Sequence, residues 1–210
     1  MVKANKTICA IIPSFNEAKT MARMLNDLIK ISFLDQIIVI NDGSTDGTQS
    51  ILNNFVRYKN IVVITNDANL GKGASVAKGL EVSKSDLVLL LDADIVNYTG
   101  HDLLKLIEPV INKRYDYTLK PTDDIILKRL SGIRCYWRSD LMPIIPKMKQ
   151  TSRYGLEILL NRHFINKNSG FIVLNDYHHY QKWEKYSLPK AVWEYFKEGA
   201  SLIKQLLILN

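Results

Sequence analysis

The sequence predicts an α/β fold in which helices flank a mainly parallel central sheet. Four short apolar runs begin between residues 7 and 87, and a segment with helical spacing of apolar residues follows each of them. The runs lack polar alternation, which is typical of strands buried on both faces of a parallel sheet. Alternating strands and helices of this kind give parallel strands joined by right-handed crossovers.

Length and composition suit a single globular domain. Of the 210 residues, 47% are hydrophobic and 23% are charged, which allows a sizeable core. No apolar run reaches the ~18 residues that a membrane-spanning helix needs. The apolar stretch after the basic N-terminus is too short for a signal peptide. We therefore expect a cytoplasmic protein, with attachment to a membrane surface left open.

The net charge of +7 arises from 28 basic and 21 acidic residues that are interleaved along the chain. Without a dense basic block, this charge does not favour nucleic-acid binding and indicates only a modest attraction to anionic substrates or lipid surfaces. Cys9 and Cys135 have the spacing of neither a metal site nor a disulfide framework. We expect both to be reduced, structural thiols.

The first strand is predicted at residues 7–12, and Pro13 is expected to end it because proline cannot donate to a sheet ladder. Asn16 is expected to cap the following helix, and Glu17 to lie in its first turn, where the helix dipole favours a carboxylate. The apolar positions of this helix keep helical spacing and are Met21, Met24, Leu25, Leu28 and Ile29.

The next two strands are predicted at residues 36–40 and 60–64. A turn-rich loop at 41–48 precedes a helix whose apolar pattern is Ile51, Leu52, Phe55 and Val56. After the third strand, a glycine-flanked Lys72 precedes a helix rich in small residues, which can pack close to the sheet. Glycines beside a lysine at a helix N-terminus suit a phosphate, but the tripeptide alone also fits a simple turn.

The fourth strand, at residues 87–91, leads directly into Asp92 and Asp94. A parallel strand delivers its last residues to the carboxyl edge of the sheet, where ligands bind in open α/β folds. Two carboxylates can hold one Mg²⁺ or Mn²⁺ and leave positions for phosphate oxygens. Because such a pair arises by chance in about every second chain of this length, the assignment depends on the neighbouring motifs.

The second half is less regular. A helix is predicted at residues 102–113, with a kink or interruption at Pro109, and a surface turn at 121–124. Further strands are predicted at 115–120, 133–137 and 170–174. A buried helix at 154–160 carries one carboxylate, Glu157, for which the solvent face and a catalytic role are both open.

Two features near the C-terminus have alternative interpretations. His178 and His179 fit either metal ligands or an edge of the core. Residues 190–209 can form an amphipathic helix that docks on the domain or a partner, or lies on a membrane surface. We therefore divide the chain into a main domain at 1–188 and a C-terminal helix at 189–210.

Four motifs share one order and spacing with a known family: P-S-F-N-E at 13–17, V-I-N-D-G-S-T-D-G-T at 39–48, N-L-G-K-G at 69–73 and L-D-A-D at 91–94. They resemble family 2 glycosyltransferases with the GT-A fold. The resemblance implies sugar transfer from a nucleotide-diphosphate sugar, assisted by Mg²⁺ or Mn²⁺. It also implies a nucleotide-sugar half at about residues 1–97 and an acceptor half at about 98–188.

The resemblance assigns roles to individual residues. The nucleotide-sugar site is formed by Pro13, Phe15, Glu17, Asp42, Ser44, Lys72 and Asp92. The metal is held by Asp94, with His179 fitting better than His178 as a further ligand. Chemistry agrees with these roles, because carboxylates accept hydrogen bonds from base N–H groups and ribose hydroxyls. A metal at Asp94 would stabilise the leaving diphosphate.

Downstream, S-G-I-R at 131–134 and R-Y-G-L-E at 153–157 look like the acceptor-side segments of glucosyl-3-phosphoglycerate synthase-like and polyprenyl-phosphate glycosyltransferase-like enzymes. In that comparison Arg134, Tyr154 and Gly155 lie on the acceptor side, and Glu157 is the acidic residue that faces sugar and acceptor. The Q-x-x-R-W motif of processive synthases is absent from the sequence. Transfer of a single sugar is therefore favoured over polymerisation.

The resulting hypothesis is a metal-dependent transferase that moves one sugar from a UDP- or GDP-sugar to a small or lipid-linked acceptor. If transfer inverts the anomeric carbon, Glu157 is the general base, with Asp123 or Asp124 as second choices. If transfer retains configuration, Glu157 orients the donor sugar. A homodimer and membrane contact through the C-terminal helix are left open.

Two alternatives belong to other functional classes. A nucleotidyltransferase usually has a glycine-rich basic loop after the first strand, whereas this chain has P-S-F-N-E there. An inactive nucleotide-sugar-binding subunit of a membrane complex would lack the metal site or the acid.

Overall fold

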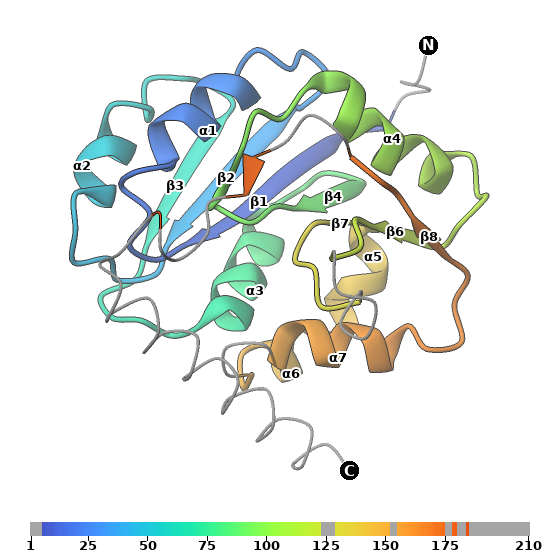
Figure 1. Ribbon diagram of the computed structural model, residues 1–210. Coiled ribbons are helices and arrows are strands. Elements are labelled where there is room, and N and C mark those ends of the chain that lie inside the picture. Colours follow the sequence, from blue (N-terminus) through green and yellow to red (C-terminus); the bar gives the residue numbers. More distant parts are fainter. Residues whose placement is uncertain (1–5, 123–128, 152–154, 175–177, 180–183, 185–210) are drawn as a thin grey trace.

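A seven-stranded sheet forms the middle layer of the computed structural model (Figure 1), which describes residues 6–122, 129–151, 155–174, 178, 179 and 184. The strand order is β3-β2-β1-β4-β7-β6-β8, and within this sheet only β7 runs antiparallel to its neighbours. The strands are β1 (Ile8–Ser14), β2 (Gln36–Asn41), β3 (Ile61–Thr65), β4 (Leu87–Leu90), β6 (Tyr117–Leu119), β7 (Arg134–Trp137) and β8 (Ser169–Phe171). The short strands β5 (Ile95–Val96) and β9 (His178–His179) form a separate antiparallel pair.

Helices cover both faces of the sheet (Figure 1). One face carries α1 (Met21–Leu28), α2 (Thr48–Asn53) and α4 (Gly100–Ile111). The other face carries α3 (Lys72–Val82), α5 (Arg138–Leu141), the 3₁₀ turn η1 (Met142–Ile144), α6 (Ile145–Met148) and α7 (Gly155–His163). The mainly parallel α/β sheet predicted from the sequence is therefore confirmed.

Strand β1 shows why the apolar runs lack polar alternation. Ile8, Ala10 and Ile12 pack into the core under α1 and α4, whereas Cys9 and Ile11 pack into the core under α3. All five residues are at most 1% exposed. Because successive side chains point to opposite faces, a strand covered on both sides needs an apolar residue at every position.

Both prolines that were expected to break an element lie inside one. Strand β1 continues through Pro13 to Ser14, because its pairing with β4 ends at Ile11 and Leu90, so the missing amide proton of Pro13 interrupts no ladder there. Helix α4 likewise contains Pro109 without interruption. Only two residues of the helix follow Pro109, so the ring is accommodated in the last turn.

The predicted helix start at Asn16 was wrong. Helix α1 begins at Met21 with Thr20 at its N-cap, and no acidic residue lies in its first turn. Asn16 has a left-handed backbone with φ of 57°, and its side-chain oxygen accepts a hydrogen bond from Thr45 N at 2.8 Å. Its polar groups therefore join two loops. The helical pattern predicted through Val56 is shorter in the structure, since α2 ends at Asn53 and Val56 is 58% exposed.

In the second half, the helix predicted at 154–160 corresponds to α7, and the three predicted strands correspond to β6, β7 and β8, with β8 ending at Phe171. Asp123, Asp124 and the C-terminal helix at 189–210 lie outside the described residues, so the domain division remains a prediction. In the part of the chain that the structure describes, no helix has the length and apolarity needed to span a bilayer.

The cysteine prediction is confirmed for both residues, which are buried and carry free thiols. Burial in apolar surroundings raises the pKa of Cys9 to about 12 and also raises the pKa of Cys135. Both groups are therefore protonated at neutral pH, which makes them unreactive.

The small residues of α3 allow the helix to pack directly on the sheet, as predicted. Ala77 and Gly79 are fully or almost fully buried. A Cβ atom at Gly79 would lie 2.7 Å from Ile11 Cγ2 and 3.1 Å from Ile40 Cδ1. The absence of a side chain at Gly79 therefore lets α3 approach the sheet closely. The first turn of α3 then lies at the carboxyl edge of the sheet.

We expect Gly79→Leu to destabilise the fold by about 1–3 kcal/mol or more, because the added side chain overpacks the core between α3 and β1. Val82→Leu on the same helix is the matched control, since Val82 is 43% exposed. Urea denaturation followed by circular dichroism measures both. Equal midpoints for the two variants would contradict the close packing.

Candidate active site

The carboxyl ends of three parallel strands gather the predicted motifs at one edge of the sheet. Ser14 ends β1 and pairs with Asn41 at the end of β2, and Asp92 follows β4 after one further residue. Pro13 lines a narrow buried crevice together with Lys72, Gly132 and Glu157. This is the edge at which open α/β sheets bind ligands.

The loops after β1 and β2 are tied to each other by side-chain-to-backbone hydrogen bonds. Ser44 Oγ accepts from Asn16 N at 2.9 Å, and Thr48 Oγ1 accepts from Glu17 N at 2.9 Å. Together with the bond from Thr45 N to Asn16, these contacts fix two predicted nucleoside-binding segments as one surface. Phe15 lies on the first of these loops and is 42% exposed, so its ring is accessible to a ligand.

Asp42 orders the loop that precedes α3. It is 3% exposed, and its carboxylate accepts hydrogen bonds from Asn66 Nδ2 at 2.8 Å, Leu70 N at 2.9 Å and Gly71 N at 2.9 Å. Gly43 adopts φ of 69°, and a Cβ there would lie 2.5 Å from the Ala68 carbonyl carbon. Since a carboxylate accepts about four hydrogen bonds, Asp42 has both a structural task and capacity for a nucleotide.

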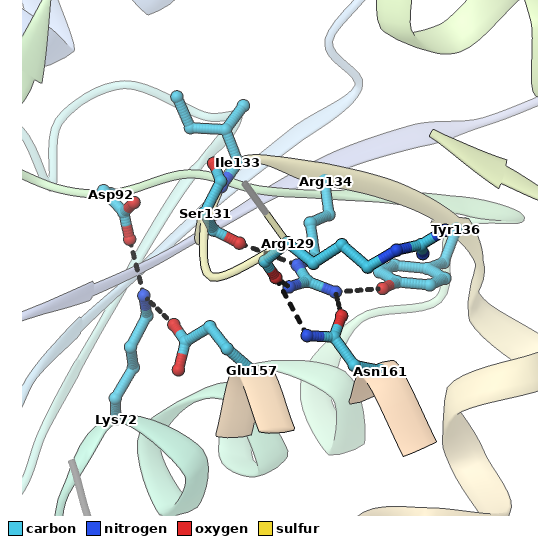
Figure 2. A network of polar contacts seen from close by, with 9 residues as sticks. All are labelled: Lys72, Asp92, Arg129, Ser131, Ile133, Arg134, Tyr136, Glu157 and Asn161. Atoms are coloured by element: carbon cyan, nitrogen blue, oxygen red, sulfur yellow. Dashed lines mark hydrogen bonds and ion pairs between the residues drawn. The ribbon is translucent and has the colours of Figure 1, made fainter. Parts of the chain in front are cut away.

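Lys72 joins Asp92 to Glu157 (Figure 2). It is the first residue of α3, and its Nζ lies 2.6 Å from Asp92 Oδ1 and 2.6 Å from Glu157 Oε1. Burial alone would lower the pKa of Lys72, but the two carboxylates outweigh it and raise the pKa above the ordinary value. The ammonium is therefore charged at neutral pH and lies between the two halves of the chain.

Glu157 lies in the first turn of α7, and its side chain is 2% exposed. The alternative of a solvent-facing glutamate was therefore wrong. Its Oε1 is paired with Lys72, whereas Oε2 is buried and has no hydrogen-bond partner among the described residues. An unpaired buried carboxylate oxygen is costly, and a bound ligand would supply the missing partner.

Asp94 is half-buried and follows Asp92 in the turn between β4 and β5. Strand β9 pairs with β5 so that the backbone of His179 lies opposite Ile95, one residue from Asp94. No group of three potential metal-binding side chains was found in the described part of the chain. The carboxylates of Asp92 and Asp94 fit the way Mg²⁺ often binds, in which one or two carboxylates and the substrate phosphates complete the coordination.

Arg134 was predicted to lie on the acceptor side, and the structure buries it completely. Its guanidinium donates to Ser131 O at 2.7 Å, Tyr136 Oη at 3.1 Å, Asn161 Oδ1 at 2.9 Å and Arg129 O. In this arrangement Arg134 organises protein groups next to the site. Gly155 is buried at the start of α7, and Tyr154 lies outside the described residues.

Sequence reasoning missed Asn66 and Asn161. Asn66 is 3% exposed, donates to Asp42, and accepts from Lys78 Nζ at 2.6 Å. Asn161 lies one turn after Glu157 on α7 and contacts Arg134 and Arg129. The spacing of Asn161 from Glu157 was the available signal, because residues four apart share a helix face. Asn66 lies in a polar turn, where no helical spacing related it to a predicted site residue.

Residues 9–182 match the sequence model described as glycosyl transferase family 2. A dolichyl-phosphate beta-glucosyltransferase of Trichomonas vaginalis is 33% identical over 101 residues, or 43% of this chain and 31% of that protein. A UDP-N-acetylglucosamine–dolichyl-phosphate N-acetylglucosaminyltransferase of Methanococcus voltae is 30% identical over 132 residues, or 55% of this chain and 52% of that protein. The matched region thus spans about a third to a half of these curated relatives.

The fold is also similar to that of glucosyl-3-phosphoglycerate synthase from Mycobacterium tuberculosis. Its complex with Mn²⁺, uridine diphosphate and phosphoglyceric acid superposes with a TM-score of 0.72 at 19% identity, over 97% of this chain and 80% of that chain. Together with the family match and the mainly parallel sheet, this similarity confirms the predicted GT-A fold.

We expect Lys72→Met to destabilise the fold by about 2–4 kcal/mol at pH 7, because it leaves the Glu157 carboxylate buried without a counter-ion. The full loss of stability is expected at pH 7. A lysine whose pKa is raised in the folded state stabilises the fold at every pH below the pKa that it has in the unfolded chain. The double variant Lys72→Met/Glu157→Leu should recover most of the loss, because it removes the stranded charge as well.

The control is Lys149→Met, which removes an exposed ion pair of the same length, 2.6 Å, to Glu81. Its effect should stay within about 0.5 kcal/mol. Urea denaturation of all three variants gives the comparison. A loss for Lys72→Met no larger than that for Lys149→Met would show that the central pair carries no special energy.

Proposed function

The chain belongs to glycosyl transferase family 2, and we propose that it moves a single sugar from a UDP- or GDP-sugar to a small or lipid-linked acceptor. The observation that carries the proposal is the Lys72 bridge between Asp92, at the end of β4, and Glu157, in the acceptor half. The bridge holds the proposed donor site close to Glu157, whose buried Oε2 has no partner in the part of the chain that the structure describes.

The donor half of the proposal follows from the loops at the sheet edge. The exposed ring of Phe15 offers a stacking surface for a base, and the remaining capacity of Asp42 suits a base or ribose donor. Glu17, Ser44 and Asp92 supply acceptor oxygens around the same edge. Pro13 lines the crevice that leads toward Lys72 and Glu157.

A divalent cation fits the carboxylates that follow β4. Asp94 would hold it, with His179 as a further ligand whose backbone lies beside this turn. When bound, Mg²⁺ or Mn²⁺ would neutralise the diphosphate and so favour its departure. Lys72 adds a fixed positive charge at the same edge, at the first residue of α3, where the helix dipole also favours an anion.

The acceptor half of the proposal rests on Glu157. For a hydroxyl acceptor in an inverting transfer, Oε2 would take the acceptor proton while Oε1 stays bound to Lys72. A phosphate acceptor needs no base, because its oxygen is already ionised. The curated relatives named above act on dolichyl phosphate, so both chemistries remain in the proposal. For a retaining transfer, Glu157 would orient the donor sugar.

We expect calorimetry to detect binding of UDP or GDP that depends on Mn²⁺ or Mg²⁺, and we expect Asp94→Ala to remove the metal dependence while the chain still folds, as circular dichroism would show. ATP and CTP serve as control nucleotides. A chain that binds none of these nucleotides, or binds them equally with and without metal, would exclude the proposed donor site. A preference for nucleoside triphosphates would favour a nucleotidyltransferase instead.

We expect Glu157→Gln to keep nucleotide binding within about threefold of the parent, because the uncharged amide still fills the same space, and to lower transfer by about 10²–10⁴-fold to a hydroxyl acceptor. Transfer from UDP-glucose and GDP-mannose is measured with 3-phosphoglycerate and with dolichyl phosphate in detergent. An unchanged rate with a hydroxyl acceptor would locate the base elsewhere. A parent chain that binds nucleotides and transfers to neither acceptor would favour an inactive binding subunit.

A further inference from the structure

Helix α7 reaches the end of β4 by two separate routes (Figure 2). The first route is the ion bridge from Glu157 through Lys72 to Asp92. The second starts one turn later at Asn161, which lies on the same face of the helix. It runs through Arg134 and the loop at residues 129–133. Both routes end at the Asp92–Lys72 pair.

The second route begins with a clasp formed by Asn161 and Arg134. Asn161 Oδ1 accepts from Arg134 Nη1 at 2.9 Å, and Asn161 Nδ2 donates to Arg129 O at 3.0 Å. Arg134 also donates to the carbonyls of Arg129 and Ser131. The two side chains thus hold both ends of a three-residue backbone segment, 129–131, against α7.

The loop then passes over the Asp92–Lys72 pair at Gly132. A Cβ atom there would overlap Asp92 Oδ1 and Lys72 Nζ, closer than any real Cβ contact. The backbone of Gly132 has no left-handed φ, so a side chain there would not strain the backbone but would force the charged ends of Asp92 and Lys72 to shift. Any movement of the loop toward the strand end therefore displaces Asp92 or Lys72.

We infer that Arg134 and Asn161 are positioning residues for nucleotide binding, which act by holding Gly132 against Asp92 and Lys72. The inference rests on the proposed function, because Asp92 is placed at the ribose or diphosphate side of the donor. The clasp keeps the Asp92 carboxylate and the Lys72 ammonium in the geometry that receives the nucleotide. Arg134 thereby acts on the donor side, although its sequence segment pointed to the acceptor.

Energetics support a positioning task over a purely structural one. Burying a guanidinium carries a large desolvation cost, and apolar replacements of buried ion networks are often as stable as the originals. The Arg134 guanidinium meets this cost by donating to four acceptors, for which its planar set of N–H donors is suited. A shorter or apolar side chain in place of Arg134 could not hold the loop at residues 129–133 in its present path.

The experiment measures binding of UDP with Mn²⁺ to the full chain by calorimetry. We expect Gly132→Ala and Asn161→Leu each to weaken binding about tenfold, since each disturbs a charge-assisted contact of Asp92. Asn161→Asp should weaken binding less than Asn161→Leu, because it retains the acceptor for Arg134. Arg134→Lys, which keeps the charge but loses the fork, should behave like Asn161→Leu.

Two controls match these variants. Gly100→Ala adds a methyl group that would lie 3.5 Å from Phe33 Cε1, an ordinary contact, and Arg162→Ala changes the exposed neighbour of Asn161 on α7. Both should bind UDP as the parent does. Thermal unfolding of every variant confirms that binding is measured on folded protein.

The decisive readout is the double variant Gly132→Ala/Asn161→Leu. Both changes act through one loop. The Kd of the double variant for UDP should therefore be no more than about twofold higher than that of the single variant with the lower affinity. If the two losses of UDP affinity multiply in the double variant, or if the single variants bind UDP as the parent does, the inference is overturned. A parent chain that does not bind UDP with Mn²⁺ would instead contradict the UDP donor site, and the positioning role with it.

Discussion

The Lys72 ammonium connects the end of β4 to helix α7 through one short ion bridge. It starts from the first residue of α3 and reaches Asp92 after β4 and Glu157 on α7, each at 2.6 Å. The Glu157 carboxylate is 2% exposed and depends most on this pairing, whereas Lys72 and Asp92 are about a quarter exposed. The position of Lys72 depends in turn on Gly79, which brings α3 against β1, and on Asp42, which orders the loop before the helix.

The loops at the sheet edge are tied together by hydrogen bonds from the chain's own side chains. Asp42 accepts hydrogen bonds from the loop at 66–71, and Asn16 and Ser44 connect the loops after β1 and β2. Holding these segments in advance reduces the ordering cost of binding, because the loop entropy is lost on folding. The same side chains can therefore serve both the fold and a ligand, which is why a capping or turn role for such residues does not exclude a binding role.

The sequence predicted the elements whose local pattern agrees with the tertiary structure. It did not predict the surroundings of charged residues, which depend on burial in the folded chain. Uninterrupted apolar runs located β1 to β4, because a strand covered on both faces needs apolar residues throughout. Glu157 and Arg134 could not be placed in this way, since a charged residue on a helix or strand is normally exposed and only the folded structure supplies its partners. Asn16 was misplaced because its side chain bonds across two loops, a contact between residues 16 and 45 that helix-capping rules do not consider.

The charges at the strand end also bear on the proposed metal. Asp92 and Glu157 contribute two negative charges, of which Lys72 balances one, and Asp94 adds a third carboxylate in the same turn as Asp92. A nucleotide diphosphate brought to this edge would meet these carboxylates as well as the Lys72 ammonium, and close like charges repel. Helix N-termini offer only about half a positive charge each, too little to compensate. A divalent cation beside Asp94 would make the site attractive to a diphosphate while leaving Lys72 bound to both carboxylates, so the ion bridge and the proposed metal site serve complementary needs.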